Sequence, residues 1–305
     1  MAPVAPPIAS PGAARPLARP RAARSFALLR ATRHTLAENR LTLVASVLFC
    51  LLLLCAVLGG AAAPYDPLAT DTTARLQPPT LAHLFGTDAL GRDILSRVMV
   101  AARLDLGMAV SAVAVSFAIG TALGAMAGYL GGGADAVFGR LMDTIMAFPL
   151  FVLAMGIVAA LGNSVLNIIL ATAVINLPFY GRFARAEVSV RRDLAYVEAA
   201  QMGGNGAVRI LSGHIVRNIL PTMAVQASLN MGWAILNAAG LSFIGLGVRP
   251  PTPEWGIMVS EGASYIISGE WWTFVFPGAA LMLAVFCFNL LGDGLRDVLD
   301  PRRRT

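Results

Sequence analysis

The stretch YVEAAQMGG, from Tyr196 to Gly204, lies in an arginine-rich segment between two long apolar runs. A short helix here would present four aromatic or small apolar side chains to a protein surface, namely Tyr196, Val197, Ala199 and Ala200. Small alanine side chains permit close docking, while Glu198 supplies a charge that can pair across the contact. The glycines at the end of the stretch let the chain turn away in conformations closed to other residues. The same spacing also fits a plain surface helix with a glycine C-cap, and spacing alone leaves both interpretations open.

Five stretches without a charged residue decide the class of the protein, and they cover residues 41–65, 106–134, 144–181, 218–248 and 271–292. The chain of 305 residues is 57% hydrophobic and 13% charged, which is too apolar for a soluble domain. A membrane span needs about 20 apolar residues, so four of the stretches hold one helix each. The third is interrupted by Gly162, Asn163 and Ser164, and it is long enough for a helical hairpin. The sequence therefore predicts an all-α polytopic membrane protein with six transmembrane helices.

The distribution of arginine predicts the orientation of these spans. Arginine supplies all 23 basic residues, and 18 of them lie on one predicted face, in the two chain ends and in the loops after the second and fourth spans. The positive-inside rule makes that face cytoplasmic, and six spans place both termini there. The arginines outside this pattern are Arg75, Arg92, Arg97, Arg103 and Arg249. The net charge of +6 is thus explained by topology, and no aromatic-basic patch indicates binding to nucleic acid.

The runs also divide the chain into segments. The predicted order is a partly disordered cytoplasmic arm at 1–40, a first transmembrane helix at 41–63, a periplasmic segment at 64–103, a five-helix transmembrane domain at 104–292 and a cytoplasmic tail at 293–305. Within the five-helix domain, the cytoplasmic loop that carries the YVEAAQMGG stretch covers about 182–217.

The periplasmic segment contains HLFGTDALGRDILSRVMVAARLDL, which has the pattern of an amphipathic helix. Thr87 or Asp88 can cap it. Two acid-before-base pairs at i,i+4 support it, and they are Asp88 with Arg92 and Asp93 with Arg97. We expect this helix to lie on the outer membrane interface, and a platform that touches a substrate-delivering protein is the alternative.

Several kinds of functional group are missing from the sequence. A P-loop needs a lysine to hold nucleotide phosphates, and this chain has none. Ion-coupled carriers usually place ionisable groups inside the membrane. The polar groups in the apolar runs of this chain are uncharged, and Asn176, Gln226 and Asn230 are examples. The three histidines and three cysteines show no spacing typical of a metal site or a catalytic triad. We therefore expect a chain that is not an enzyme, and that binds no cofactor or metal itself.

Two further patterns concern helix packing in the spans. Gly120, Gly124 and Gly128 repeat a small-xxx-small motif, which lets another helix approach closely along that face. Pro149 lies early in the third span and predicts a structural kink, with a gating hinge as the alternative.

The loop that carries Glu198, Ala199, Ala200 and Gly204 resembles the EAA loop of permease subunits of bacterial ABC importers. Further stretches resemble the dipeptide, oligopeptide and nickel group of that family, in the same order along the chain. They are HLFGTDALGRD, MAFP, LSFIGLGVRPPTPEWGIMVSEG and FNLLGDGLRDVLDP. The resemblance covers about Leu41 to Pro301 and is greatest to the C-type subunit of the dipeptide branch. The chain departs from the family pattern at Arg217, where a proline is usual, and this puts the start of the fifth span in doubt.

This resemblance implies the fold of a type I ABC importer transmembrane domain in the cell inner membrane, which moves dipeptides or short peptides. It implies a second, homologous permease subunit as a heterodimer partner, two ABC ATPase subunits that bind ATP and Mg²⁺, and a periplasmic or lipid-anchored substrate-binding protein. By residue, it assigns the coupling helix to Tyr196, Val197, Glu198, Ala199, Ala200 and Gly204. The alternatives are the same architecture importing nickel, glutathione or another small solute, an ATP-independent carrier or channel, and a membrane scaffold protein.

Overall fold

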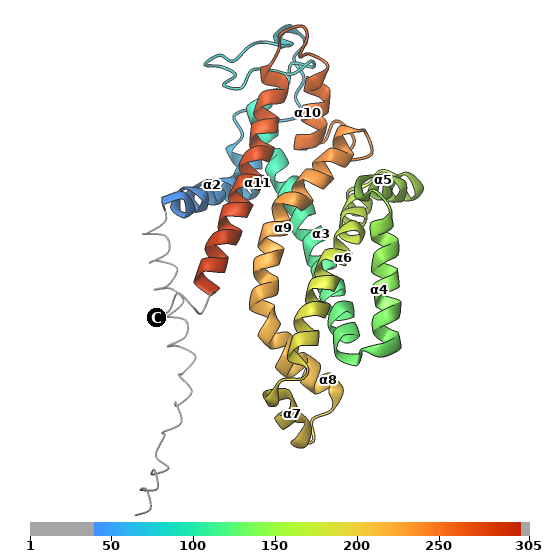
Figure 1. The fold of residues 1–305 in the computed structure, drawn as a ribbon. Helices are drawn as coiled ribbons and strands as arrows, with labels where there is room; N and C mark the ends of the chain where they lie inside the picture. Colours follow the sequence, from blue (N-terminus) through green and yellow to red (C-terminus); the bar gives the residue numbers. More distant parts are fainter. Residues whose placement is uncertain (1–39, 300–305) are drawn as a thin grey trace, which may run out of the picture.

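The computed structural model of the protein describes residues 40–299, and the chain there is helical (Figure 1). Its long helices are α2 (Arg40–Ala62), α3 (Ile94–Leu130), α6 (Val165–Arg191), α9 (Arg217–Phe243) and α11 (Trp272–Leu299). Its shorter elements are α4 (Gly132–Ala147), α5 (Leu150–Leu161), α7 (Ala195–Met202), α8 (Ala207–Ile210), α10 (Trp255–Ala263), the 3₁₀ turn η1 (Thr72–Ala74) and the π-helical turn η2 (Leu211–Val216). The predicted all-α class is confirmed. The expectations for the arm before residue 40 and for the end of the tail lie outside the described residues.

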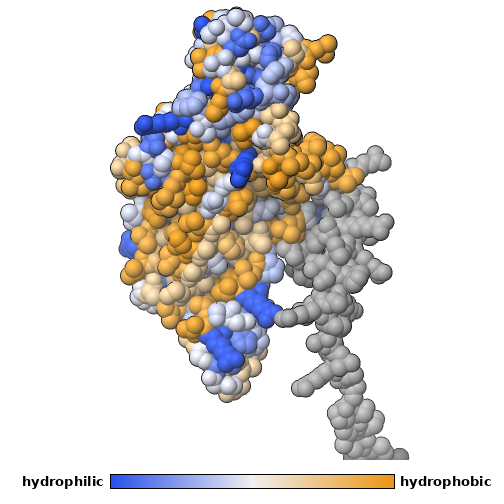
Figure 2. All heavy atoms as spheres, turned by 180° about the vertical axis from the view of Figure 1, so that it is seen from behind, coloured by the Kyte–Doolittle hydropathy of each residue, from blue (hydrophilic) through white to orange (hydrophobic). Residues whose placement is uncertain are grey.

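The predicted six spans correspond to five continuous helices and one bent pair. The helices long and apolar enough to cross a membrane run over Leu43–Ala62, Ile94–Leu130, Val165–Arg191, Ala207–Phe243 and Trp272–Asp297. The sixth span is present if α4 and α5 together count as one, although the two helices meet at 88°. Figure 2 shows one face of the molecule, with a broad apolar band across its middle and hydrophilic residues gathered at its two ends, as expected for this class.

The third span departs from its predicted form. We expected a helix that continues through a kink at Pro149, but α4 begins at Gly132 and ends before the proline. Phe148 has an extended backbone, because the ring of a following proline disfavours the helical region for the preceding residue. Pro149 then becomes the N-cap of α5, where its missing N–H costs nothing. The proline thus breaks the span instead of bending it.

The predicted interfacial helix is also corrected. The residues after Asp93 form the first turns of the 37-residue helix α3, and the rest of the segment is a loop that contains η1. Neither Thr87 nor Asp88 caps the helix, since Asp93 does so by accepting a hydrogen bond from the Ser96 N–H at 2.8 Å. A helix starting earlier is blocked at Gly91, which has a φ of +75°.

The fifth span begins without a break despite the arginine at position 217. Arg217 is the first residue of α9, and the π-helical turn η2 joins α8 to it in one continuous apolar helix. Pro221 lies inside α9 and can offer no N–H to the carbonyl one turn earlier. The irregularity of this span is the π-helical turn, which lies before the proline.

Helix α3 is the centre of the bundle and packs against α2, α6, α9 and α11. Its contact with α6 is made by glycine. A Cβ atom added at Gly124 would lie 2.0 Å from the carbonyl oxygen of Gly181, and one added at Gly128 would lie 2.6 Å from that of Arg185. At Gly120 the added atom would lie 2.9 Å from the carbonyl oxygen of Leu177. The three glycines of the sequence motif thus face α6 along three successive turns, with the two backbones in direct contact.

The close contact between α3 and α6 predicts that Gly124→Ala destabilises the protein. No side chain can yield, since the obstacle is backbone, so the helices must separate at a cost of about 1–3 kcal/mol or more. Gly107→Ala is the matched control on the same helix, because nothing lies within 4 Å of its added Cβ. Thermal unfolding of the purified chain in detergent should show a lower midpoint for Gly124→Ala and an unchanged or higher one for Gly107→Ala, because alanine favours the helix more than glycine does. Equal midpoints would contradict the packing argument.

Candidate functional site

The candidate coupling segment lies at one end of the bundle, where α7 and α8 connect α6 to α9 (Figure 1). The loop before α3 and helix α10 lie at the opposite end. The YVEAAQMGG stretch therefore forms a short helix beyond the ends of the long helices, and α7 contacts α8. Several large apolar side chains are exposed around it, and they are Leu194, Tyr196, Met202 and Val208.

Helix α7 has one face toward the protein and one toward solvent. Val197 is fully buried and Ala200 is buried, and both belong to the main apolar cluster together with Ile210 and Ile215. Our expectation that these two residues would be offered to a partner surface is therefore wrong, because their periodicity matches the inner face of the helix. Tyr196, Glu198 and Ala199 are exposed. The exposed face of α7 is therefore the part of the helix that a partner protein could contact.

The end of α7 is a tight left-handed turn. Gly204 has a φ of +78°, which glycine adopts without strain. Its N–H donates to the carbonyl of Gln201 at 2.9 Å, and the Gly203 N–H donates to that of Ala199 at 3.0 Å. The side chain of Asn205 adds a hydrogen bond to the Ala200 carbonyl at 2.9 Å. The last carbonyls of the helix are thus satisfied, and the chain can turn directly into α8.

Ion pairs join α4 to α6 near this end of the bundle. Arg185 forms a bidentate pair with Asp135, and Arg182 pairs with Asp143. Arg192 donates to the carbonyl of Gly128 at 3.2 Å. Arg182 and Arg185 belong to the arginines that the sequence indicated as a topology signal. They therefore also hold the bent pair α4–α5 against the bundle. The pairs of side chains come from different helices, and sequence spacing could not reveal them.

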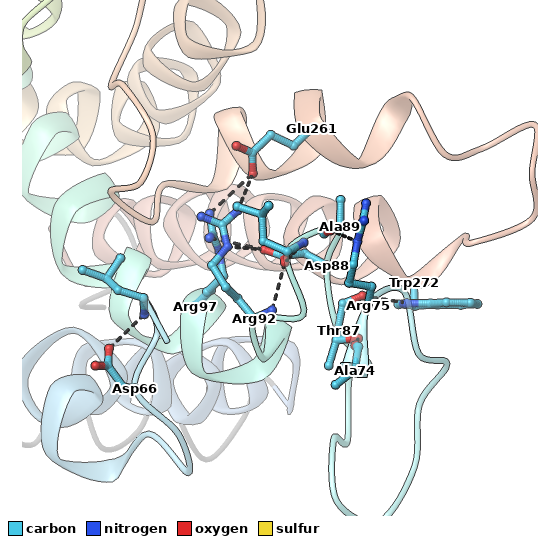
Figure 3. Close-up of polar contacts among 12 residues, drawn as sticks. Asp66, Ala74, Arg75, Thr87, Asp88, Ala89, Arg92, Arg97, Glu261 and Trp272 are labelled. Carbon is cyan, nitrogen blue, oxygen red and sulfur yellow. Dashed lines mark hydrogen bonds and ion pairs between the residues drawn. The ribbon is translucent and has the colours of Figure 1, made fainter. Parts of the chain in front are cut away.

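At the opposite end, four charged side chains meet between the start of α3 and α10 (Figure 3). Arg92 and Arg97 are almost completely buried, and they share two carboxylates, those of Asp88 and Glu261. The predicted pair of Asp88 with Arg92 is formed at 2.6 Å. Asp93, however, turns toward His83 at 3.0 Å and caps α3, while Arg97 faces Asp88 instead.

The four charges line a cavity of about 320 Å³. Tyr265, Ser264 and Thr273 add polar groups to its wall. The sequence did not indicate this site, because Glu261 lies 169 residues from Arg92. One signal in the sequence could have revealed the site. Arg92 and Arg97 are among the arginines that do not follow the positive-inside rule, and an arginine on that side of the membrane needs an acidic partner.

A second group of acids anchors α10 to α3. Asp105 and Glu254 are both buried, and the backbone N–H of Trp255 donates to Asp105 at 3.1 Å. Glu254 caps α10 by accepting from the N–H groups of Gly256 and Ile257. Burial raises the pKa of the Glu254 carboxyl above its ordinary value, although these hydrogen bonds and one with Asp105 oppose the shift. The pair fixes the start of α10 at a defined place on α3.

The amide side chains noted in the spans come together in a cleft. Asn176 of α6 and Gln226 and Asn230 of α9 line a cleft of about 800 Å³, and the rest of its wall is mostly apolar. Asn176 is buried and donates to the Thr172 carbonyl at 3.0 Å. Among residues 40–299 no group of three or more His, Cys, Asp or Glu side chains could hold a metal ion.

These observations define the class of protein as a multi-pass membrane protein, with a bundle of long apolar helices and a short helix exposed at one end. Comparison with known families agrees. Residues 120–305 match the family described as binding-protein-dependent transport system inner membrane component, and residues 28–79 match the N-terminal transmembrane domain of oligopeptide transport permease C. The chain belongs to the family of binding-protein-dependent permeases, as its sequence motifs indicated.

Individual relatives match along most of their length. The probable D,D-dipeptide transport system permease protein DdpC of Escherichia coli is 47% identical over 267 residues, which are 88% of this chain and 89% of the relative. The di/tripeptide transport system permease protein DppC of Pseudomonas aeruginosa is 40% identical over 272 residues, or 87% and 89%. The nickel transport system permease protein NikC of Escherichia coli is 39% identical over 258 residues, or 85% and 93%. The relatives thus include permeases for more than one kind of solute.

The two faces of α7 lead to opposite predictions for the same substitution. Val197→Asp places a carboxylate in a fully buried site, so α7 should detach from the bundle. Ala199→Asp places it on the exposed face of the same helix and should leave the fold unchanged. Limited trypsin digestion reports the difference, because the exposed Arg209 lies in α8, the helix that α7 contacts. We expect faster cleavage at Arg209 in Val197→Asp only, and equal rates in both variants would contradict the seating of α7.

Proposed function

We propose that this chain is one permease subunit of an ATP-driven importer of dipeptides or short peptides. The observation that carries the proposal is the 47% identity to a probable D,D-dipeptide permease over 88% of the chain, together with a helical bundle that presents the EAA segment at one end. Two peptide permeases stand among the relatives described above, and their names supply the solute class.

The proposed assembly has partners at both ends of the bundle. Two ABC ATPases, which bind ATP and Mg²⁺, dock at the α7 end, and this end faces the cytoplasm by the distribution of arginine. A second, homologous permease completes the path across the membrane. A substrate-binding protein delivers the peptide at the end that carries α10. Support for the ATPase contact comes from Tyr196, Glu198 and Ala199, which are exposed on a helix whose other face is buried.

The seating of α7 explains how movement of an ATPase reaches the membrane. Val197 and Ala200 pack in one apolar cluster with Ile210 and Ile215, so α7 cannot slide without moving the start of α9. Through the short link after Arg191 it is also joined to α6. A push on α7 therefore acts on α6 and α9 together, and these two helices line the amide cleft. Rigid transmission of this kind is what alternating access requires.

The main rival is the same architecture with a different solute. A nickel permease is 39% identical, and nothing in the path described above selects a peptide over another small solute. The proposed substrate-binding protein would separate these alternatives, since its affinity for dipeptides or for nickel can be measured directly. An ATP-independent carrier is distinguished by transport that persists without any ATPase.

The proposed docking contact predicts that Glu198→Lys abolishes ATP-driven uptake. The substitution reverses a charge on the exposed face of α7, so it removes any pairing with the ATPase without disturbing the buried face. Asp66→Lys reverses an exposed charge at the opposite end of the bundle and is the matched control. Uptake of labelled dialanine into proteoliposomes, and recovery of ATPase with the tagged permease, should both fall at least about tenfold for Glu198→Lys alone. Normal uptake by this variant would refute the coupling role of α7.

A further inference from the structure

The cavity between α3 and α10 has the construction of a binding site for a carboxylate. Arg97 is 1% exposed and Arg92 is 4% exposed, so two guanidinium groups are held almost free of water. Buried cations of this kind are costly unless they are paired, and unpaired donors among them mark a place for a ligand. Nη1 of Arg97 donates no hydrogen bond within residues 40–299, although it lies 3.3 Å from an oxygen of Asp88. One donor of the pair is therefore buried without a hydrogen bond, and its nearest acceptor is Asp88.

The two carboxylates of the site hold the guanidinium groups unequally. Asp88 lies 2.6 Å from Nε of Arg92, which is a normal charge-assisted hydrogen bond. Glu261 lies 3.4 and 3.5 Å from the two arginines, and its side chain is 34% exposed. The Glu261 contacts are long and open to water, so they are weak and replaceable. Asp88 fixes the arginines in place, and Glu261 occupies the positions that another carboxylate could take.

The place of the cavity in the molecule fits a solute that arrives from outside. It lies between the start of α3 and α10, at the end opposite α7 (Figures 1 and 3). Its volume of about 320 Å³ is at the lower limit for small-molecule sites, which suits a dipeptide or one end of a longer peptide. Every short peptide carries a C-terminal carboxylate, whatever its side chains. A site that reads this group alone can serve a transporter of varied peptides.

We propose that Arg92 and Arg97 bind the C-terminal carboxylate of the transported peptide, with Glu261 displaced from the guanidinium groups and left to accept hydrogen bonds from the peptide ammonium. The site is a receiving position in this permease, separate from the binding protein. The proposal rests on the function proposed above for its solute class.

Equilibrium dialysis of the full chain in lipid nanodiscs tests the site with three probes, which are L-alanyl-L-alanine, its C-terminal amide and N-acetyl-L-alanine. We expect saturable binding of the free dipeptide and at least about tenfold weaker binding of the amide, because the amide loses a charge-assisted contact. Arg97→Gln should weaken binding of the free dipeptide by a similar factor. Arg103→Gln replaces an exposed arginine of the same helix outside the cavity and should change nothing.

Glu261→Gln separates a binding role from a structural one, and it decides the question even if Arg97→Gln does not fold. Removing the competing carboxylate should tighten binding of N-acetyl-L-alanine, which has a carboxylate and no ammonium, by about threefold or more. A purely structural ion-pair network predicts unchanged or weaker binding. Equal affinity for the free and amidated dipeptide, or no gain in Glu261→Gln, would overturn the proposal.

Uptake by the assembled importer distinguishes failure of this proposal from failure of the proposed function. If dialanine is taken up with ATP but the chain alone shows no Arg97-dependent binding, the carboxylate site is wrong and the function stands. If dialanine binds in an Arg97-dependent way but no peptide is taken up, the cavity does bind a carboxylate, but the solute class and the role of the cavity in peptide transport are wrong.

Discussion

The contact between the backbones of α3 and α6 is the constraint on which the rest of the bundle depends. A membrane offers no hydrophobic force to press helices together, so close packing and hydrogen bonds must do it. Here Gly124 meets the carbonyl of Gly181 with no room for a Cβ atom. Such a contact fixes which face of α3 meets α6, because rotating α3 would bring side chains larger than glycine against the α6 backbone. The two helices therefore behave as one rigid unit, and the other spans are arranged around it.

This rigid unit joins the two ends of the molecule. Helix α6 leads into α7, where the exposed face is proposed to meet an ATPase, and α3 begins at the buried arginines of the opposite end. The same α3 also holds Asp105, which receives the N–H of Trp255 and so positions α10. A displacement of α7 would thus reach Arg97 and Glu261 through packed helices and ion pairs. Coupling between the ends then follows from stiffness and needs no separate pathway.

The sequence predicted the features that depend on composition and local pattern. Charge-free runs gave the class and the spans, and the repeat at Gly120, Gly124 and Gly128 predicted a close helix contact. The predictions from sequence were wrong where contacts between residues far apart in the chain determine the structure. Residues after Asp93 were expected on the membrane interface, but burial of Arg97 against Asp88 and Glu261 draws them into a long helix. Likewise Val197 and Ala200 were expected outside, although their spacing matches the inner face that Ile210 and Ile215 cover. Pairs so far apart in the chain leave no local pattern.

The placement of charge fits a solute that is received at the end of the bundle that carries α10 and not between the long helices. Among the described residues, the cleft between α6 and α9 is lined by amides and apolar groups, with Arg182 as its charged residue. Amides donate and accept weakly, so they can accompany a peptide without holding it. Guanidinium groups kept nearly free of water bind a carboxylate much more strongly. Weak amide contacts suit a path that must release its solute, and strong guanidinium contacts suit a site that receives it. The separation of charged and amide groups along the bundle therefore matches the order in which a transported peptide would meet them.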